Sequence, residues 1–320
     1  MIQVVKEELT DYNSFVSEIT TKVREMMGES INVSIYKVIK NNSLELDSLV
    51  MLKEGKNFAP NIYLMPYYES YLKGSSVEEI ADRLCEIYQH CEVPIVKDNF
   101  TYSFEDMKPY ITYRLVSYER NKILLSKTPY IKYLDLAVTF HCLVRNDEEG
   151  IGTIRITNEH IKMWKTSLNE INAMAIKNTS KLFPHSIRSM NEVIKGILQD
   201  EFTSNKEDDL SGDLFNQFVY NTEINDQHKM YILSNQKGIN GASCMLYEDV
   251  LKKFANQIKS DLYILPSSIH EIILIPYQKD MKKETLMEMV KDVNRTQVAR
   301  DEILSDQVYY YSREQNAIIM

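Results

Sequence analysis

Residues 261–276, DLYILPSSIHEIILIP, contain two apolar runs that are separated by a short polar segment. The runs at 262–265 and 272–275 are rich in the branched and aromatic side chains that strands favour. The proline and the paired serines between them are residues typical of turns. We therefore predict two strands joined by a loop at 266–271, and this hairpin is the starting point for placing the rest of the chain.

The loop of this hairpin also holds the side-chain chemistry of a hydrolase, at Ser267, Ser268, His270 and Glu271. Consecutive residues of an extended segment point apart, so His270 and Glu271 are not expected to form the base and orienting partner of a triad. No GxSxG motif surrounds either serine. We interpret the loop as a structural turn. A binding surface, or a hydrolase or transferase centred on these four residues, are the alternatives.

The periodicity of apolar residues before and after the hairpin predicts the fold class. We expect an α+β protein of two lobes, with antiparallel or mixed sheets flanked by helices. The N-terminal lobe, residues 1–104, has the predicted order α-β-β-β-α. Its third strand is expected within 61–72 and its second helix within 74–91, where Ser76 and Glu79 are spaced as a capping box.

The C-terminal lobe, residues 105–320, is predicted to begin with a helix at 105–125. Apolar residues recur there at spacings of three and four, as on a buried helix face: Phe104, Met107, Ile111, Leu115 and Tyr118. Between 108 and 132 the chain also carries six bases against one acid, with tyrosines interleaved, a composition that could bind a nucleic acid. Since most of these bases fall on the solvated side of the predicted helix and the net charge is −9, we expect no nucleic-acid partner. Docking of the bases against an acidic segment of the same protein is the alternative.

The remainder of the C-terminal lobe alternates between strand and helix patterns. Ser167 and Glu170 are spaced as a second capping box, which starts a helix. The predicted elements are a strand at 133–144, a hairpin partner or following strand at 153–164, a helix from 167, a helix at 189–200, a strand at 230–235, a helix at 247–259, a helix at 282–295, and a closing hairpin of 307–311 and 316–320.

A strongly acidic stretch lies at residues 200–226, which contain eight acidic residues and one basic residue, Lys206. Its centre has some likeness to a calcium-binding loop. If Glu207 takes the first loop position, however, Phe218 falls where a bidentate glutamate is required, so the match fails. We interpret the stretch as a solvated, mobile connection.

The composition excludes the common cofactor loops. Average usage predicts about 22 glycines in a chain of this length, and this chain of 320 residues has 9. Neither GxGxxG nor GxxxxGK[ST] occurs, so we expect no nucleotide cofactor. The four cysteines lack CxxC spacing, and the adjacent His–Cys pairs point to opposite faces of a strand, so we expect no metal.

Three further places are candidates for a site. Cys244 follows a glycine-bearing loop and precedes a helix, where a thiol can become nucleophilic; core filler is the alternative, and we favour it. His160 and Trp164 are four residues apart, which suits either the edge of a core or the stacking of a ligand. Asn294 and Arg295 end a helix, where the guanidinium could bind an anion or complement the helix dipole.

Several segments resemble, in the same order, an uncharacterised family of proteins from Gram-positive bacteria that is known only as a domain of unknown function. The residues that carry the resemblance are LYILPSSIHEIILIP at 262–276, VNRTQVARDEILSDQVYYY at 293–311, LDLAVTFHCLV at 134–144, ITNEHIKMW at 156–164 and INAMAIKNTSKLFP at 171–184. The resemblance covers most of the chain from about residue 105 onward, and the N-terminal lobe more loosely. It implies a fold and a cytoplasmic context, and it supplies no catalytic residues.

These observations predict a non-catalytic binding or regulatory protein that acts through a macromolecular partner, expected to be another protein. The first residues lack the basic and apolar regions of a signal peptide, and no apolar run has the length of a membrane span. We expect a soluble cytoplasmic protein that does not bind a membrane. The sequence leaves its oligomeric state open.

Overall fold

The computed structural model divides the chain into two compact units, residues 1–100 and 101–320, and each is described by itself. The described residues are 2–55, 59, 61–90, 103–147, 150–196 and 229–320. The acidic stretch at 200–226 and the end of the helix expected at 189–200 lie outside them. Antiparallel sheets flanked by helices confirm the predicted α+β class.

The first unit packs helices against a three-stranded antiparallel sheet of order β1-β2-β3. The predicted third strand is wrong beyond Tyr63, because α2 starts at Met65. Pro66 suits the first turn of a helix, and Tyr68 and Tyr71 then lie one turn apart. The elements are α1 (Ile2–Met27), β1 (Ile31–Ile39), η1 (Asn41–Ser43), β2 (Glu45–Lys53), β3 (Asn61–Tyr63), α2 (Met65–Leu72) and α3 (Val77–His90).

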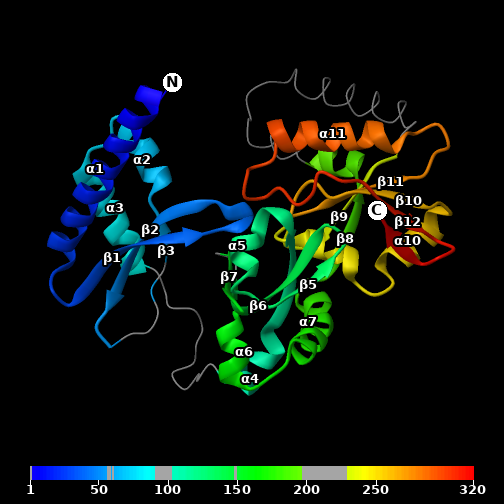
Figure 1. Cartoon of the computed structure of the whole chain (residues 1–320), viewed down its shortest axis with the longest axis horizontal. Helices are drawn as coiled ribbons and strands as arrows, with labels where there is room; N and C mark the ends of the chain where they lie inside the picture. Colours follow the sequence, from blue (N-terminus) through cyan, green and yellow to red (C-terminus); the bar gives the residue numbers. More distant parts are fainter. Residues whose placement is uncertain (1, 56–58, 60, 91–102, 148–149, 197–228) are drawn as a thin grey trace. The chain divides into compact units, whose positions relative to one another are not determined.

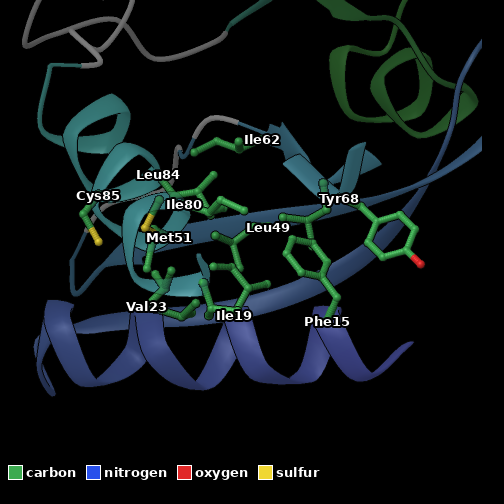
Figure 2. Close-up of a cluster of buried hydrophobic side chains, with 14 residues drawn as sticks. Phe15, Ile19, Val23, Leu49, Met51, Ile62, Tyr68, Ile80, Leu84 and Cys85 are labelled. Atoms are coloured by element: carbon green, nitrogen blue, oxygen red, sulfur yellow. The ribbon is translucent and has the colours of Figure 1, made fainter. Parts of the chain in front are cut away.

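The core of the first unit lies between α1, α3 and the sheet, as Figure 2 shows. Phe15, Ile19 and Val23 recur at helical spacing, so α1 presents them together toward the core. The start of α3 is fixed by the predicted capping box, in which Ser76 and Glu79 each accept a hydrogen bond from the backbone of the other. From the strands and α3, the core receives Leu49, Met51, Ile62, Ile80, Leu84 and Cys85.

The second unit contains a six-stranded antiparallel sheet of order β13-β12-β10-β11-β9-β8. The predicted hairpin lies in it as β10 and β11, with Ile264 opposite Leu274. The closing hairpin is also confirmed, as β12 and β13. The strands are β8 (His185–Ser189), β9 (Tyr231–Asn235), β10 (Leu262–Leu265), β11 (Ile272–Pro276), β12 (Tyr309–Ser312) and β13 (Ala317–Ile319).

A second sheet of the same unit has the order β4-β6-β5, with β7 paired to the far end of β6. The helix α7 begins at the predicted capping box of Ser167 and Glu170. Residues 190–196 are helical as well. The strands are β4 (Ile111–Ser117), β5 (Tyr130–Tyr133), β6 (Leu136–Asp147) and β7 (Gly150–Arg155). The helices are α4 (Phe104–Met107), η2 (Lys108–Tyr110), η3 (Glu119–Asn121), α5 (Lys122–Leu125), α6 (Asn158–Trp164), α7 (Leu168–Leu182), η4 (Gly241–Leu246), α10 (Val250–Ile258) and α11 (Lys283–Thr296).

The predicted helix at 105–125 is wrong. Ser103 caps the short α4, Pro109 lies in the following turn, and the chain then extends as strand β4. Ile111 and Leu115 are four residues apart, a spacing that places two side chains on one face of a strand as well as of a helix. Branched and aromatic residues in ITYRLVS favour the strand.

Strands β10 and β11 form the middle of the six-stranded sheet and are covered on both faces. On one face, Tyr263 and Leu265 pack with Leu286 and Val290 of α11, the helix drawn in orange across the sheet in Figure 1. On the other face, Leu262 and its alternating neighbours are also buried. A hairpin buried on both faces admits few polar residues, so its polar side chains gather in the loop.

A partly buried polar junction connects the C-terminal strands to the turn between β5 and β6. The Asp135 carboxylate accepts hydrogen bonds from the Tyr309 hydroxyl and, at 2.7 Å, from the Ser305 hydroxyl. The Asn294 amide donates to the Ser305 carbonyl at 2.9 Å and to the Asp306 carboxylate at 2.8 Å. Since Tyr309 belongs to one sheet and Asp135 flanks the other, this junction ties the two sheets together.

We predict that Tyr309→Phe lowers the free energy of unfolding by about 1.5–3 kcal/mol, the usual value of a hydrogen bond to a charged group. The matched control is Tyr311→Phe in the same strand, since the Tyr311 hydroxyl donates to the neutral amide oxygen of Asn316. Its cost should be about 1 kcal/mol. Urea unfolding followed by circular dichroism measures both values. Equal losses in the two variants would contradict a special role of the Asp135 junction.

Candidate functional site

The loop between β10 and β11, residues 266–271, is held along its length by backbone hydrogen bonds. Residues 302–305 run beside it, and the bonds include Leu304 N–H to the Ser267 carbonyl and Ser305 N–H to the Pro266 carbonyl, both 2.9 Å. Ser268 and Ile303 form an isolated antiparallel bridge. The loop is therefore a fixed bend.

His270 extends from this bend between two partners. Its Nδ1 accepts a hydrogen bond from the Asn240 backbone N–H at 3.3 Å, and its Nε2 lies 3.4 Å from Glu302 Oε1. An accepting Nδ1 places the ring proton on Nε2, facing the Glu302 carboxylate. The imidazole is thus held from two sides, and neither partner is a serine hydroxyl.

Ser268 connects the loop to itself. Its side chain is 6% exposed, and its hydroxyl accepts from the His270 backbone N–H at 3.0 Å. The same hydroxyl is hydrogen bonded to the Glu271 carboxylate. Because the Ser268 hydroxyl is already hydrogen bonded within its own loop, it is not a partner of the His270 imidazole.

Glu271 is the titratable group of the loop with a displaced pKa. Burial raises the pKa of its carboxyl above the ordinary value, and the nearby Glu302 carboxylate adds to the rise. The hydrogen bond from Ser268 opposes the rise, as does the charge of the His270 ring when that ring is protonated. A partly desolvated carboxyl of this kind can bind a polar ligand or move a proton.

A hollow of about 520 Å³, which we call the Glu271 hollow, opens beside this carboxyl. Ser267 and Glu271 line it, whereas Ser268 and His270 do not, so the structure separates the four candidate residues of the loop into two pairs. The other lining residues come from β8, β9, β11 and the flanks of β8 and β9, and they include Arg188, Val193, Ile232, Lys237 and Ile273.

A second hollow, of about 680 Å³, lies on the opposite side of β8, and we call it the His185 hollow. His185, Ile187 and Ser189 line it, while Arg188 lines the Glu271 hollow. This division follows from the alternation of side chains along a strand. The other walls of the His185 hollow include Glu192, Tyr231, Glu248, Lys253 and Phe254.

Strand β8 is the last strand of its sheet within the described part of the chain. Two backbone hydrogen bonds at the ends of β8 show which of its residues face β9. Gln236 N–H donates to the Pro184 carbonyl, and Met190 N–H donates to the Met230 carbonyl. In an antiparallel ladder such pairs alternate, so the even-numbered residues of β8 bond to β9. The N–H and C=O groups of His185 and Ile187 therefore point to the outer edge.

The sequence analysis missed β8, which consists of only five residues. The available signals were Pro184, which ends the preceding helix pattern, and the polar–apolar alternation of HSIRS.

Cys244, His160 and Trp164 make packing or capping contacts within the second unit. Cys244 is fully buried, and burial raises the pKa of its thiol to about 12, opposite to the shift that a nucleophile requires. His160 accepts the Thr157 backbone N–H through Nδ1 in a capping box and stacks on Trp164, which in turn packs against Phe104.

Asn294 and Arg295 are adjacent in the sequence, but they differ in burial and in partners. Asn294 is 4% exposed and belongs to the Asp135 junction. The Arg295 side chain is 78% exposed and pairs with Asp292 on its own helix. Asn294 is connected to the loop at 266–271 through Ser305, whose backbone N–H donates to the Pro266 carbonyl, whereas Arg295 lines neither hollow.

No group of three metal-ligating side chains converges anywhere in the described residues. None of the described helices combines the length and the apolar character that a membrane-spanning helix needs.

The fold and this site define an α+β protein in which a partly buried polar loop joins two central strands of the six-stranded sheet, and two hollows flank β8, the last strand of that sheet in the described residues. The chain belongs to a family of unknown function, DUF5688, whose model matches residues 12–313. This match confirms the resemblance to a domain of unknown function. No curated protein and no solved structure matches the chain.

We predict that Cys244 resists alkylation in the folded protein. With a pKa of about 12, its thiolate is scarce at pH 8, and it should react roughly a thousandfold more slowly than an unperturbed cysteine. Mass-spectrometric labelling with iodoacetamide, in a Cys91→Ser background, measures the rate. Cys142 is the internal control, since burial raises its pKa to about 12 as well. Rapid labelling of Cys244 alone would contradict the assignment and restore the nucleophilic alternative.

Proposed function

We propose that this protein is a non-catalytic binding or regulatory protein that acts through another protein. The observation that carries the proposal is the outer edge of β8, where backbone donors and acceptors lie between two hollows. An extended segment of a partner protein can add to such an edge as a further strand.

Strand addition accounts for both hollows at once. Backbone hydrogen bonds to His185 and Ile187 would align the partner segment along β8. Side chains of an added strand point alternately to the two faces of the sheet, and one hollow lies on each face of β8. Backbone hydrogen bonds would then supply the affinity, and the two hollows would select which side chains of the partner segment fit.

The walls of the hollows suggest which partner side chains fit. Ile187, Tyr231 and Phe254 give the His185 hollow an apolar surface, which suits a branched or aromatic side chain. Arg188 and Lys237 add positive charge to the Glu271 hollow, beside the Glu271 carboxyl. A polar side chain that accepts hydrogen bonds from the bases suits this second hollow.

A hydrolase or transferase that uses the loop at 266–271 is the second candidate. One observation favours it: Glu271, whose pKa is raised by burial, lines a hollow together with Ser267. The separation of Ser268 and His270 from that hollow weighs against it, because a nucleophile needs a base within hydrogen-bonding reach. Labelling with a serine-directed fluorophosphonate probe separates the two candidates, and we expect no label on Ser267 or Ser268.

We also propose that the protein acts in the cytoplasm of a Gram-positive bacterium. The sequence resemblance described above supports this origin. Cys85, Cys142 and Cys244 are buried free thiols, which fits a reducing compartment.

We predict that Ile187→Pro abolishes strand addition and leaves the fold intact. Proline removes the N–H that faces the outer edge, and proline is tolerated where an edge strand faces solvent. Binding peptides would first be selected from a displayed library of extended sequences, and their dissociation constants would then be measured by fluorescence polarisation. Ile187→Pro should weaken the selected peptides at least about tenfold.

Two controls make this experiment decisive. Ile187→Val keeps the backbone N–H and should bind within a few-fold of the wild type. Arg188→Pro removes an N–H that bonds to β9 and should lower the melting temperature, which verifies the assignment of the two edges. Unchanged peptide affinity in a folded Ile187→Pro variant would rule out β8 as the docking strand.

A further inference from the structure

The two hollows beside β8 differ in their balance of charge. Arg188 and Lys237 line the Glu271 hollow, where Glu271 is the only acid among the described lining residues. The His185 hollow has the opposite balance, because two glutamates line it with a single lysine, Lys253. A charged side chain therefore meets different surroundings on the two faces of the sheet at β8.

The two bases of the Glu271 hollow are exposed, and in the described ranges neither of them forms an ion pair. The pKa of Glu192 is lowered chiefly by hydrogen bonds from Ser189, and Arg188 adds to this effect through its charge alone. Glu271 is hydrogen bonded to Ser268, and burial raises the pKa of its carboxyl. The hollow of about 520 Å³ thus has room and surplus positive charge for a further carboxylate.

A strand added to β8 would place one of its side chains directly against Arg188. The backbone groups of His185 and Ile187 point outward, so these two residues would form the hydrogen-bonded pairs with an antiparallel partner. Arg188 would then belong to a non-hydrogen-bonded pair, in which the opposed Cα atoms approach to about 4.5 Å. Opposed residues share a face of the sheet, so the partner side chain at this position lies on the side of the Glu271 hollow.

The direction of the added strand determines the order of its residues. All the pairs of the six-stranded sheet in the described residues are antiparallel, and antiparallel addition continues this pattern. In that direction, the partner residue opposite Arg188 comes immediately before the partner residue opposite Ile187. The second of these residues faces the His185 hollow, with its apolar wall of Ile187, Tyr231 and Phe254.

We propose that the segment which adds to β8 is an acidic one, with an aspartate or glutamate opposite Arg188 immediately before an apolar residue opposite Ile187. This inference rests on the strand addition proposed above, and it states the chemistry of the partner. Opposite charges on directly opposed residues of two strands attract, and like charges repel. Lys237 adds a second positive charge to the same hollow, so a basic residue at this position of the partner is disfavoured.

Peptides that differ at one residue test the proposal. The peptides selected for binding to β8 are synthesised with Glu, Gln or Lys immediately before the apolar residue, and their dissociation constants are measured by fluorescence polarisation. Replacing Glu by Gln should weaken binding about twofold to fivefold, as expected for an exposed ion pair, and Lys should weaken it further.

The same measurement separates the two proposals. If the three peptides bind equally well and all lose affinity in Ile187→Pro, the acid preference is overturned and strand addition stands. If no selected peptide loses affinity in Ile187→Pro, both proposals are overturned.

Arg188→Glu tests the residue that would pair with the acid. It reverses the charge and keeps the backbone N–H that bonds to β9, so the ratio of the Glu and Lys peptide affinities should fall at least about fivefold. Arg295→Glu is the matched control, because Arg295 is 78% exposed and lines neither hollow. It should leave the ratio unchanged. An unchanged ratio in a folded Arg188→Glu variant would overturn the pairing.

Salt provides a second readout on the wild-type protein, which decides the question if Arg188→Glu does not fold. The Debye length falls from about 10 Å at 0.1 M to about 3 Å at 1 M salt. The preference for the Glu peptide over the Gln peptide should therefore shrink in molar sodium chloride. A preference that persists undiminished would assign it to shape and overturn the charge pairing.

Discussion

The burial of β10 and β11 on both faces is the constraint on which the second unit depends. Side chains of both alternating sets are buried, so each face of the sheet needs a covering layer. Helix α11 is the covering layer for Tyr263 and Leu265. The polar residues between the two strands cannot enter either layer unless their hydrogen bonds are satisfied. The loop at 266–271 is consequently bonded to residues 302–305 and to the η4 segment, where Ala242 N–H donates to the Ile269 carbonyl.

Gly241 shows how closely η4 and this loop approach. A β-carbon at Gly241 would lie 2.1 Å from the Ser234 hydroxyl oxygen and 2.5 Å from the His270 carbonyl oxygen. The two oxygens are themselves joined, because the Ser234 hydroxyl donates to the His270 carbonyl at 2.7 Å. A loop enclosed this tightly is suited to hold the sheet together. Two hollows flank β8 instead, which is the last strand of the sheet in the described residues, and this contrast leads us to place binding at that edge.

Short-range sequence patterns predicted much of the fold. The error at β4 arose because one spacing of apolar residues fits both a helix and a strand. The β10–β11 hairpin and the capping boxes at Ser76 and Ser167 depend on neighbouring residues only, so the sequence was sufficient for them. The spacing of Ile111 and Leu115 fits a helix and a strand equally, and β4 was misassigned for that reason. At the candidate site, the sequence predicted that His270 and Glu271 diverge. It could not predict Asn240 and Glu302 as partners of the imidazole, because both come from elements distant in the chain.

The basic residues between 108 and 132 show that the same composition places charged side chains in different surroundings on a helix and on a strand. On a helix, these side chains would have been spread around a solvated surface, where water screens like charges. On a strand, Arg114 is brought across β6 to within hydrogen-bonding distance of Thr153, and Arg155 joins it from a segment some forty residues away. Burial then removes the screening, so that the repulsion between the two guanidinium groups is felt by His141 as well. Composition alone therefore does not decide whether a basic side chain is solvated or lies among other bases, because the register of the strands decides which side chains share a face.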